Sequence, residues 1–232
     1  MKKSILRIVK LAVIAALACA GCTDNGDTES PNNSGVVDQF LNGVMDGGGN
    51  GGGGVDTIGP NNNNGGGGDN YTYTGRTVTI GGKVWMAENL NRATANSKCY
   101  DNDPSNCETY GRLYTWADAR SACPSGWHLP TDAEWTELAD AAGGFTAGQK
   151  LKSTSGWNNI RNNGTDDYGF SALPGGWGDG NFYDAGNSGH WWSATESGTA
   201  YAWYRYMIYE DTFVTRRLGG KEYLFSVRCV QN

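Results

Sequence analysis

Glycine and tryptophan occupy different parts of this 232-residue chain, and this separation limits what the chain can fold into. Thirteen of the 26 residues from Gly43 to Gly68 are glycine, whereas all nine tryptophans lie between Trp85 and Trp203. A glycine-rich stretch with few apolar side chains cannot offset its ordering entropy by burial. The sequence therefore predicts a flexible segment followed by a region with an unusually aromatic core.

The first 21 residues have the composition of a secretory signal. Three basic residues precede a mostly apolar stretch, Ile8 to Ala20, which is too short to remain as a membrane-spanning helix. Ala20-Gly21-Cys22 resembles a bacterial lipobox, whose cysteine receives the lipid and becomes the mature N-terminus. Cys19, which stands where that motif usually has leucine, is a weaker competing anchor, and an ordinary cleaved signal is the alternative. We expect residues 1–21 to be removed and Cys22 to be the lipid anchor.

Residues 22–70 are expected to be a disordered tether. Two unbroken glycine runs, Gly51–Gly54 and Gly65–Gly68, flank the asparagine run Asn61–Asn64. A flexible coil of about 50 residues has a root-mean-square reach of roughly 40 Å, so it would hold a following domain clear of a membrane surface.

Charge and hydropathy exclude two classes of protein. Without residues 1–21 the chain has 14 basic and 24 acidic side chains, a balance that repels phosphate backbones and excludes nucleic acid as a partner recognised by charge. No long apolar run follows residue 21, which excludes a transmembrane bundle.

The first half of residues 71–232 predicts a β-hairpin and two short helices. Arg76–Ile80 and Lys83–Ala87 are alternating runs joined by two glycines, a strong hairpin signal. One helix is expected from Thr115 to the residue before Pro124, and a second after the capping box Thr131-Asp-Ala-Glu134, ending at Gly143-Gly144. The candidates for the buried face of the hairpin are Val78, Ile80, Val84 and Met86.

The second half predicts loops and then strands. Residues 156–198 show little periodicity and are expected to be long loops rich in glycine and aromatic residues. Three strands should follow, with turns at Glu210-Asp211 and Gly219-Gly220: Ala202–Tyr209, Thr212–Arg217 and Tyr223–Val230. The fold class expected from this pattern is α+β with an antiparallel sheet.

Five groups of residues follow one another in a recognisable order across residues 73–232. They are Cys99–Trp116, Ala122–Thr131 with Glu134-Trp135, Gly169–Pro174, Trp191–Glu196 and Phe225–Val230. Together they resemble the Fibrobacter succinogenes major paralogous domain family, which is in turn similar to the formylglycine-generating-enzyme branch of the C-type-lectin-like fold. The resemblance implies a lectin-like domain over residues 71–232 and a surface location, and it supplies no known reaction.

Four cysteines lie within this domain and allow three pairings. Cys99 and Cys107 flank the turn-forming Asp-Pro-Ser-Asn, so we expect a local disulfide between them. Cys123 would then pair with Cys229, a bridge from a helix end to the last strand that also matches the lectin-like fold. A four-cysteine zinc site normally has paired CxxC spacings, which these four cysteines lack, so disulfides are favoured.

No group of residues in the sequence indicates catalysis, and we expect a protein that is not an enzyme. The oxidase branch of the related fold uses a cysteine pair near its C-terminus, where Cys229 stands alone here. His128 is more typical of a packed, hydrogen-bonded residue than of a base. The paired carboxylates Asp166-Asp167 and Glu210-Asp211 occur in turns, where such pairs are usually solvated.

Cofactors and metals are not expected. The Glu-Pro-Asn or Gln-Pro-Asp triplet of sugar-binding C-type lectins is absent, and Trp157-Asn158-Asn159 is one carboxylate short of their Trp-Asn-Asp triplet. A calcium ion elsewhere among the acids stays an open alternative, without support from a lectin-type site.

The segment Trp177–Asp184, with His190 nearby, is the best candidate for ligand binding. Ring faces beside carboxylates and amides suit carbohydrate or peptide recognition, because the rings give apolar contact and the polar groups set orientation. The alternative is that the rings are core, which we favour for Trp191 and Trp192. The candidate ligand-binding residues are Trp177, Asp179, Asn181, Tyr183, Asp184 and His190.

These observations favour a non-enzymatic protein, anchored by lipid in the outer membrane or at the cell surface. Its lectin-like domain would bind a polysaccharide or another envelope protein. The alternatives are an enzyme related to the formylglycine-generating fold and a purely structural envelope protein.

Overall fold

The structure, a computed structural model, describes residues 71–158 and 164–232. These residues form four α-helices, two 3-10 helices and eleven strands in two sheets, which confirms the α+β class. The expected signal, Cys22 and the tether through residue 70 lie outside the described residues. Among the residues that are described, no helix is both long and apolar enough to cross a membrane.

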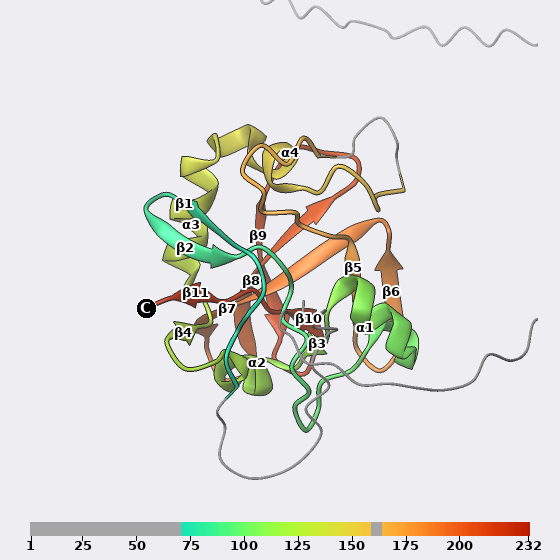
Figure 1. The fold of residues 1–232 in the computed structure, drawn as a ribbon. Helices are drawn as coiled ribbons and strands as arrows, with labels where there is room; N and C mark the ends of the chain where they lie inside the picture. The colour runs from blue at the N-terminus through green and yellow to red at the C-terminus, as the bar shows by residue number, and fades with distance from the viewer. Residues whose placement is uncertain (1–70, 159–163) are drawn as a thin grey trace, which may run out of the picture. The chain divides into compact units, whose positions relative to one another are not determined.

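The helices are short and lie mostly in the first half of the domain (Figure 1). They are α1 (Pro104–Tyr110), α2 (Trp116–Ala122), α3 (Asp132–Ala141), α4 (Ala147–Leu151) and the 3-10 turns Tyr100–Asn102 and Gly144–Thr146. The strands are β1 (Thr77–Ile80), β2 (Lys83–Met86), β3 (Leu113–Tyr114), β4 (Trp127–His128), β5 (Gly175–Gly178), β6 (Phe182–Ala185), β7 (Ser188–Ser197), β8 (Tyr201–Ile208), β9 (Thr215–Gly220), β10 (Phe225–Ser226) and β11 (Val230–Gln231).

Both expected helices form, and both begin as their caps predict. The Thr115 side chain accepts a hydrogen bond from the Asp118 N–H at the start of α2, and Thr131 and Glu134 form the complete capping box of α3. The expectation of only two helices is wrong, because α1 and α4 also form. The start of α1 carries a usable signal: Asp103 caps the helix, and a proline follows at its first position.

The smaller sheet brings the beginning of the domain beside its end. Its strand order is β1-β2-β11-β4, and Val230 of β11 pairs with Trp85 on one side and His128 on the other. Figure 1 shows the C-terminus at this sheet, beside the β1–β2 hairpin. The last residues of the chain are therefore an internal strand that holds the first hairpin to β4.

The predicted hairpin is confirmed, but its four predicted buried residues do not share one face. Ile80 pairs with Lys83 across the turn, which places Trp85 opposite Val78. Directly opposite residues share one face of a hairpin, so Trp85 points to the same core as Val78 and Ile80. The two expected residues of the second strand lie on its other face, where Met86 is fully buried as predicted and Val84 is partly buried.

The larger sheet is mixed, and its centre is β7. This strand pairs antiparallel with β8 and has parallel pairs with β5 and β10. The prediction of loops over residues 156–198 is therefore wrong, as is that of a purely antiparallel sheet. Glycine is unfavourable in strands, yet β5 requires it: a Cβ on Gly176 would lie 2.3 Å from the carbonyl oxygen of Tyr183.

The C-terminal strands also differ from the prediction. The expected turn at Gly219-Gly220 lies inside β9, which runs three residues further than expected. The expected strand Tyr223–Val230 divides into β10 in the larger sheet and β11 in the smaller one. The chain thus crosses between the two sheets after Ser226, a change that alternation along the sequence does not show.

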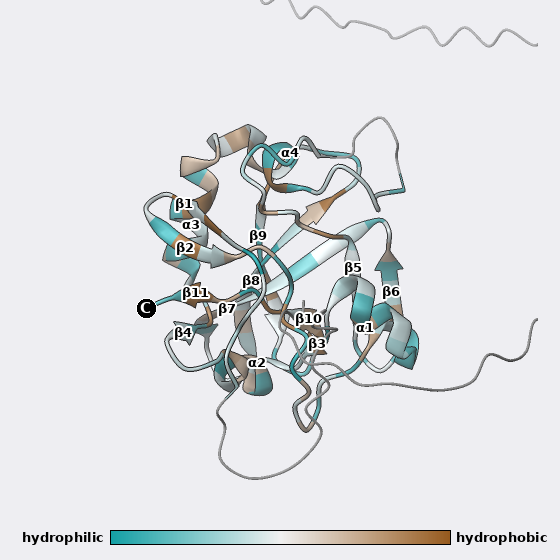
Figure 2. Cartoon of the chain, in the orientation of Figure 1, coloured by the Kyte–Doolittle hydropathy of each residue, from teal (hydrophilic) through white to brown (hydrophobic). Residues whose placement is uncertain are grey.

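The core consists of two clusters built around tryptophan. One contains Trp85, Trp135 and Trp191, and the other contains Trp116 and Trp192. Trp191 and Trp192 are fully buried, which confirms the expectation that they belong to the core. In Figure 2 α2 carries both hydrophobic and hydrophilic colours, in keeping with its single buried side.

Both expected disulfides form. Cys99 bonds to Cys107 across the 3-10 turn and α1, and Cys123 bonds to Cys229. The second bond ties the end of α2 to the chain crossing between the sheets. The segment between Cys99 and Cys107 is largely helical, and not only the turn that its Asp-Pro-Ser-Asn sequence suggests.

Candidate functional site

Three of the predicted ligand-binding residues form one unit on the β5–β6 hairpin. Trp177 lies opposite Tyr183, and their ring centroids are 4.8 Å apart with an interplanar angle of 32°. The Trp177 indole N–H donates to the Asp184 carboxylate at 3.3 Å. The hairpin register therefore produces a ring pair with a carboxylate at its edge.

Two further predicted residues lie at the turn of this hairpin. The Asn181 N–H donates to the Asp179 carboxylate at 3.4 Å, and the Asp179 N–H donates to the Asn181 carbonyl at 3.0 Å. Both side chains are exposed. They supply polar groups at one end of the hairpin without lying between the rings.

His190 lies on β7, behind the ring pair. Its ring centroid is 6.1 Å from that of Trp177 and 5.6 Å from that of Tyr206, with which it is stacked. Its Nε2 lies 2.8 Å from the Ser188 hydroxyl, while its Nδ1 is buried without a hydrogen-bond partner among the described residues. Burial lowers the pKa of His190 to about 3, so the ring is neutral at neutral pH. His190 therefore packs against the rings of this surface as an uncharged group, and it is not protonated at neutral pH.

These rings belong to a longer surface on one side of the larger sheet, which we call the aromatic row. Its partly exposed members come from β5, β6, β8 and the turn before β10: Trp177, Tyr183, Tyr204, Tyr206 and Tyr223. The Trp177 ring centroid lies 5.6 Å from that of Tyr223, and Tyr204 and Tyr206 are 6.2 Å apart. The Arg217 guanidinium lies 6.0 Å from the Tyr206 centroid, at the far end.

Sequence reasoning missed three members of the row. Tyr204 and Tyr206 are two positions apart on β8, and residues at that spacing share one face of a strand. The alternation of Tyr204 and Tyr206 can be read from the sequence. The β5 strand that carries Trp177 was not predicted, so there was no reason to place Trp177 beside the two tyrosines. Tyr223 precedes β10, and only the folded structure brings it to Trp177.

A separate cavity of about 490 Å³ lies between α1, the chain after β2 and two later loops. None of the predicted ligand-binding residues lines it. Asp166 does line it, and its carboxylate accepts hydrogen bonds from the Ser171 N–H and hydroxyl, both at 2.6 Å. The expectation of a simply solvated carboxylate pair is therefore wrong for Asp166.

The other residues weighed for chemistry have structural partners. His128 Nδ1 lies 2.6 Å from the Asn232 side-chain oxygen, and its Nε2 lies 3.0 Å from Glu134. The ring thus joins the start of α3 to the end of the chain. Within residues 71–158 and 164–232 there is no group of three or more His, Cys, Asp or Glu side chains placed to hold a metal ion.

Comparison with known families decides the identity of the domain. The family model described as the Fibrobacter succinogenes major domain matches residues 78–231. The chain belongs to this family. The Fibrobacter succinogenes major domain here takes in both sheets, both disulfides and the aromatic row, and it leaves residues 1–77 outside. No curated protein and no solved structure matches the chain.

Proposed function

We propose that this protein is a lipid-anchored surface protein whose domain binds a polysaccharide through the aromatic row, without catalysing a reaction. The observation that carries the proposal is the close, tilted Trp177–Tyr183 ring pair with Asp184 at its edge. Ring faces give apolar contact to the C–H face of a sugar, and the carboxylate accepts from a sugar hydroxyl.

The composition of the row favours a polysaccharide over an envelope protein. Four of its five rings are tyrosines, so nearly every apolar surface carries a hydroxyl that donates and accepts. A hydroxyl-rich polymer can satisfy these groups along its whole length. Protein interfaces usually have a fully apolar centre. Tyr183 is the most exposed member of the row, at 37%, and the other four rings are partly buried.

A C-type-lectin-like fold is part of this proposal. Its support is the bond between Cys123 and Cys229 and the pairing of the last strand with the first hairpin, which keep the two ends of the domain together. The anchor at Cys22 and the tether of residues 22–70 then present the domain to an extracellular ligand.

The enzyme alternative would gain support from one cleft that held both carboxylates and His190. The carboxylate-lined cavity does not include His190, which is enclosed among rings on β7. We therefore keep binding as the proposed function.

Tyr183 is the best residue with which to test the row. It is exposed, whereas Trp177 is partly buried against Tyr223 and Phe225, so that Trp177→Ala should also cost stability, contrary to what its glycine-rich context suggests. In a binding screen of the detergent-solubilised protein against glycans and cell-wall polymers, with and without calcium, Tyr183→Ala should weaken the best ligand at least tenfold. Loss of a stacked ring typically costs about 1–2 kcal/mol or more.

The matched control is Tyr201→Ala. Tyr201 is 54% exposed and also lies on the larger sheet. It is three residues before Tyr204 on β8, so its side chain lies on the opposite face of the sheet. We expect this variant to bind within twofold of the unchanged protein, and both variants to melt within a few degrees of it. Equal losses in the two variants, or no binding to any polymer, would contradict the proposal.

A further inference from the structure

The cavity beside α1 has the position and size of a second binding site. At about 490 Å³ it falls within the range of small-molecule pockets. The Trp191 indole N–H donates to the side-chain oxygen of Asn89, which lines the cavity. Trp191 directly follows His190 on β7, and His190 packs against the aromatic row. Successive residues of a strand point to opposite faces, so the cavity and the aromatic row lie on opposite sides of the sheet.

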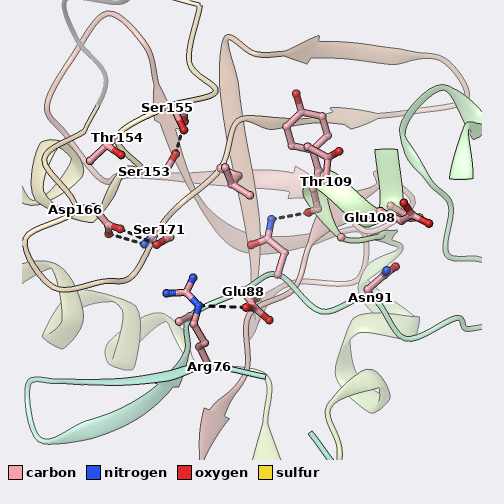
Figure 3. A pocket seen from close by; sticks show the side chains of 16 residues that line it. Arg76, Glu88, Asn91, Glu108, Thr109, Ser153, Thr154, Ser155, Asp166 and Ser171 are labelled. Atoms are coloured by element: carbon pink, nitrogen blue, oxygen red, sulfur yellow. Dashed lines mark hydrogen bonds and ion pairs between the residues drawn. The ribbon is translucent and has the colours of Figure 1, made fainter. Parts of the chain in front are cut away.

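Several polar groups on the cavity wall have bonding capacity left over (Figure 3). Glu108, Asn91, Thr154 and Ser155 are exposed to solvent at the rim, and their side chains form no hydrogen bond or ion pair within the part of the chain that the structure describes. Glu88 has one such bond, to Arg76 at 3.3 Å, and both side chains are about half exposed. The wall thus offers acceptors and donors together, as Figure 3 shows on several sides of one space.

A buried positive charge lies under this wall. Arg228 is fully buried and donates to the Asn89 side-chain oxygen at 2.9 Å and to the carbonyl oxygens of Phe170 and Ser171. Among the described residues no carboxylate lies within ion-pair distance of it. Burial lowers the pKa of Arg228 to about 9, and Asp166 and Glu88, which line the cavity, act against that shift. The guanidinium therefore offsets part of the negative charge above it.

The walls are held in place before any ligand arrives. Cys107, which lines the cavity, is bonded to Cys99, and the Asn89 side-chain N–H donates to the Tyr110 carbonyl at the end of α1 at 2.8 Å. On the opposite wall Asp166 and Ser171 have φ of 50° and 51°, a region that non-glycine residues rarely adopt, and they are hydrogen-bonded to each other. A preformed wall lowers the entropy cost of binding.

The charges select the class of ligand. An anion would be repelled by Glu88, Glu108 and Asp166, and a cation would meet Arg76 and the charge of Arg228. A neutral polyol avoids both costs, because each hydroxyl can donate to a carboxylate or accept from an N–H. We propose that the cavity binds a neutral, hydroxyl-rich small molecule of the size of a mono- or disaccharide. This site is independent of the aromatic row and does not rest on the function proposed for it.

Isothermal titration calorimetry on the detergent-solubilised full chain tests the site. The probes are neutral mono- and disaccharides, with a uronic acid and an amino sugar of the same ring size for comparison. We expect one-site binding of at least one neutral sugar, and at least tenfold weaker or undetectable binding of the two charged sugars. Glu108→Gln and Thr154→Val should each weaken binding of the neutral sugar at least fivefold, since neither side chain has another partner among the described residues.

Two controls separate this site from the aromatic row. Glu222→Gln changes an exposed acid outside the cavity and should leave the affinity within twofold, as should Tyr183→Ala. Melting curves check that every variant is folded. The absence of saturable binding by any neutral sugar would overturn the proposal, as would tighter binding of a charged sugar. Loss in Tyr183→Ala with retention in Glu108→Gln would also overturn it, because the sugar would then belong to the row.

Discussion

Asn89 shows how much one polar side chain can connect in this domain. It is 8% exposed, and its oxygen accepts from Trp191 at 2.9 Å and from Arg228. Its N–H donates to the Tyr110 carbonyl at 2.8 Å. A core tryptophan, a buried guanidinium and the end of α1 are thereby satisfied by a single amide, and buried polar groups of this kind are costly when left unpaired.

At the same scale, His190 predicts a specific loss of stability in mild acid. Burial lowers the pKa of its imidazole to about 3 from an ordinary value of 6.5. As the pH falls below 6.5 the unfolded chain takes up the proton first, so the stabilising contribution is complete above 6.5 and is lost towards pH 3. The free energy of unfolding should decrease by up to about 1.4 kcal/mol per pH unit in this window. Urea unfolding at pH 7.5 and pH 5 should show a loss of about 2 kcal/mol from this residue.

The control for this prediction is His190→Phe, which keeps a ring between Tyr206 and Phe225. All other titratable groups are the same in both proteins, so the difference between the two slopes isolates His190. Parallel stability profiles in the two proteins would show that the imidazole is not buried in its neutral form.

At the scale of elements, short helices and strands are held by links between distant segments. The last two strands have two residues each, and β11 is held by its neighbours on both sides. The crossing between them carries Cys229, whose bond to Cys123 closes a loop of 106 residues. The Cys99–Cys107 bond spans only 8 residues and acts locally on α1.

These two disulfides should differ in their effect on stability. The chain-entropy relation gives about 5 kcal/mol for the long loop and about 2–3 kcal/mol for the short one. We expect the double variant Cys123→Ala/Cys229→Ala to lose roughly twice as much unfolding free energy as Cys99→Ala/Cys107→Ala. Denaturant titrations of the two double variants check this without leaving a free thiol. Comparable losses would mean that the long bond closes a loop already restricted in the unfolded chain.

At the scale of the whole molecule, we expect the domain to be attached to a membrane through the segment that precedes it. The family match begins at residue 78, and the described structure begins at residue 71. The residues before them include the lipobox-like Ala20-Gly21-Cys22. Nothing in the fold tests this segment, so the anchor stays a prediction.

Intact mass spectrometry of membrane-extracted protein should find a mature chain that begins at a diacylated Cys22. Cys22→Ser should release the protein from the membrane fraction, whereas Cys19→Ser, the matched change at the competing cysteine, should leave it there. A mature chain that begins elsewhere, or release by the Cys19 variant alone, would contradict the assignment.

Features that depend on neighbouring residues could be predicted from the sequence alone. Two glycines between alternating runs specify the β1–β2 turn, and Thr131 with Glu134 specifies the start of α3, because each signal lies within a few positions. The α+β class, both cysteine pairs and the family could also be predicted, and Trp177, Tyr183 and Asp184 could be named as candidate ligand-binding residues, although their pairing across a hairpin could not.

The remaining features depend on partners far away in the chain, so they could be assigned only from the folded domain. The glycine-rich β5 is a strand only because β6 and β7 lie beside it, and it is their register that brings Trp177 to His190. The cavity beside α1 depends on Asn89 meeting Arg228, 139 residues later, in a bond that no local pattern encodes. Local preferences are weak compared with the burial and pairing that such distant contacts supply, so the sheet, and not the sequence pattern, selects which polar and aromatic groups meet.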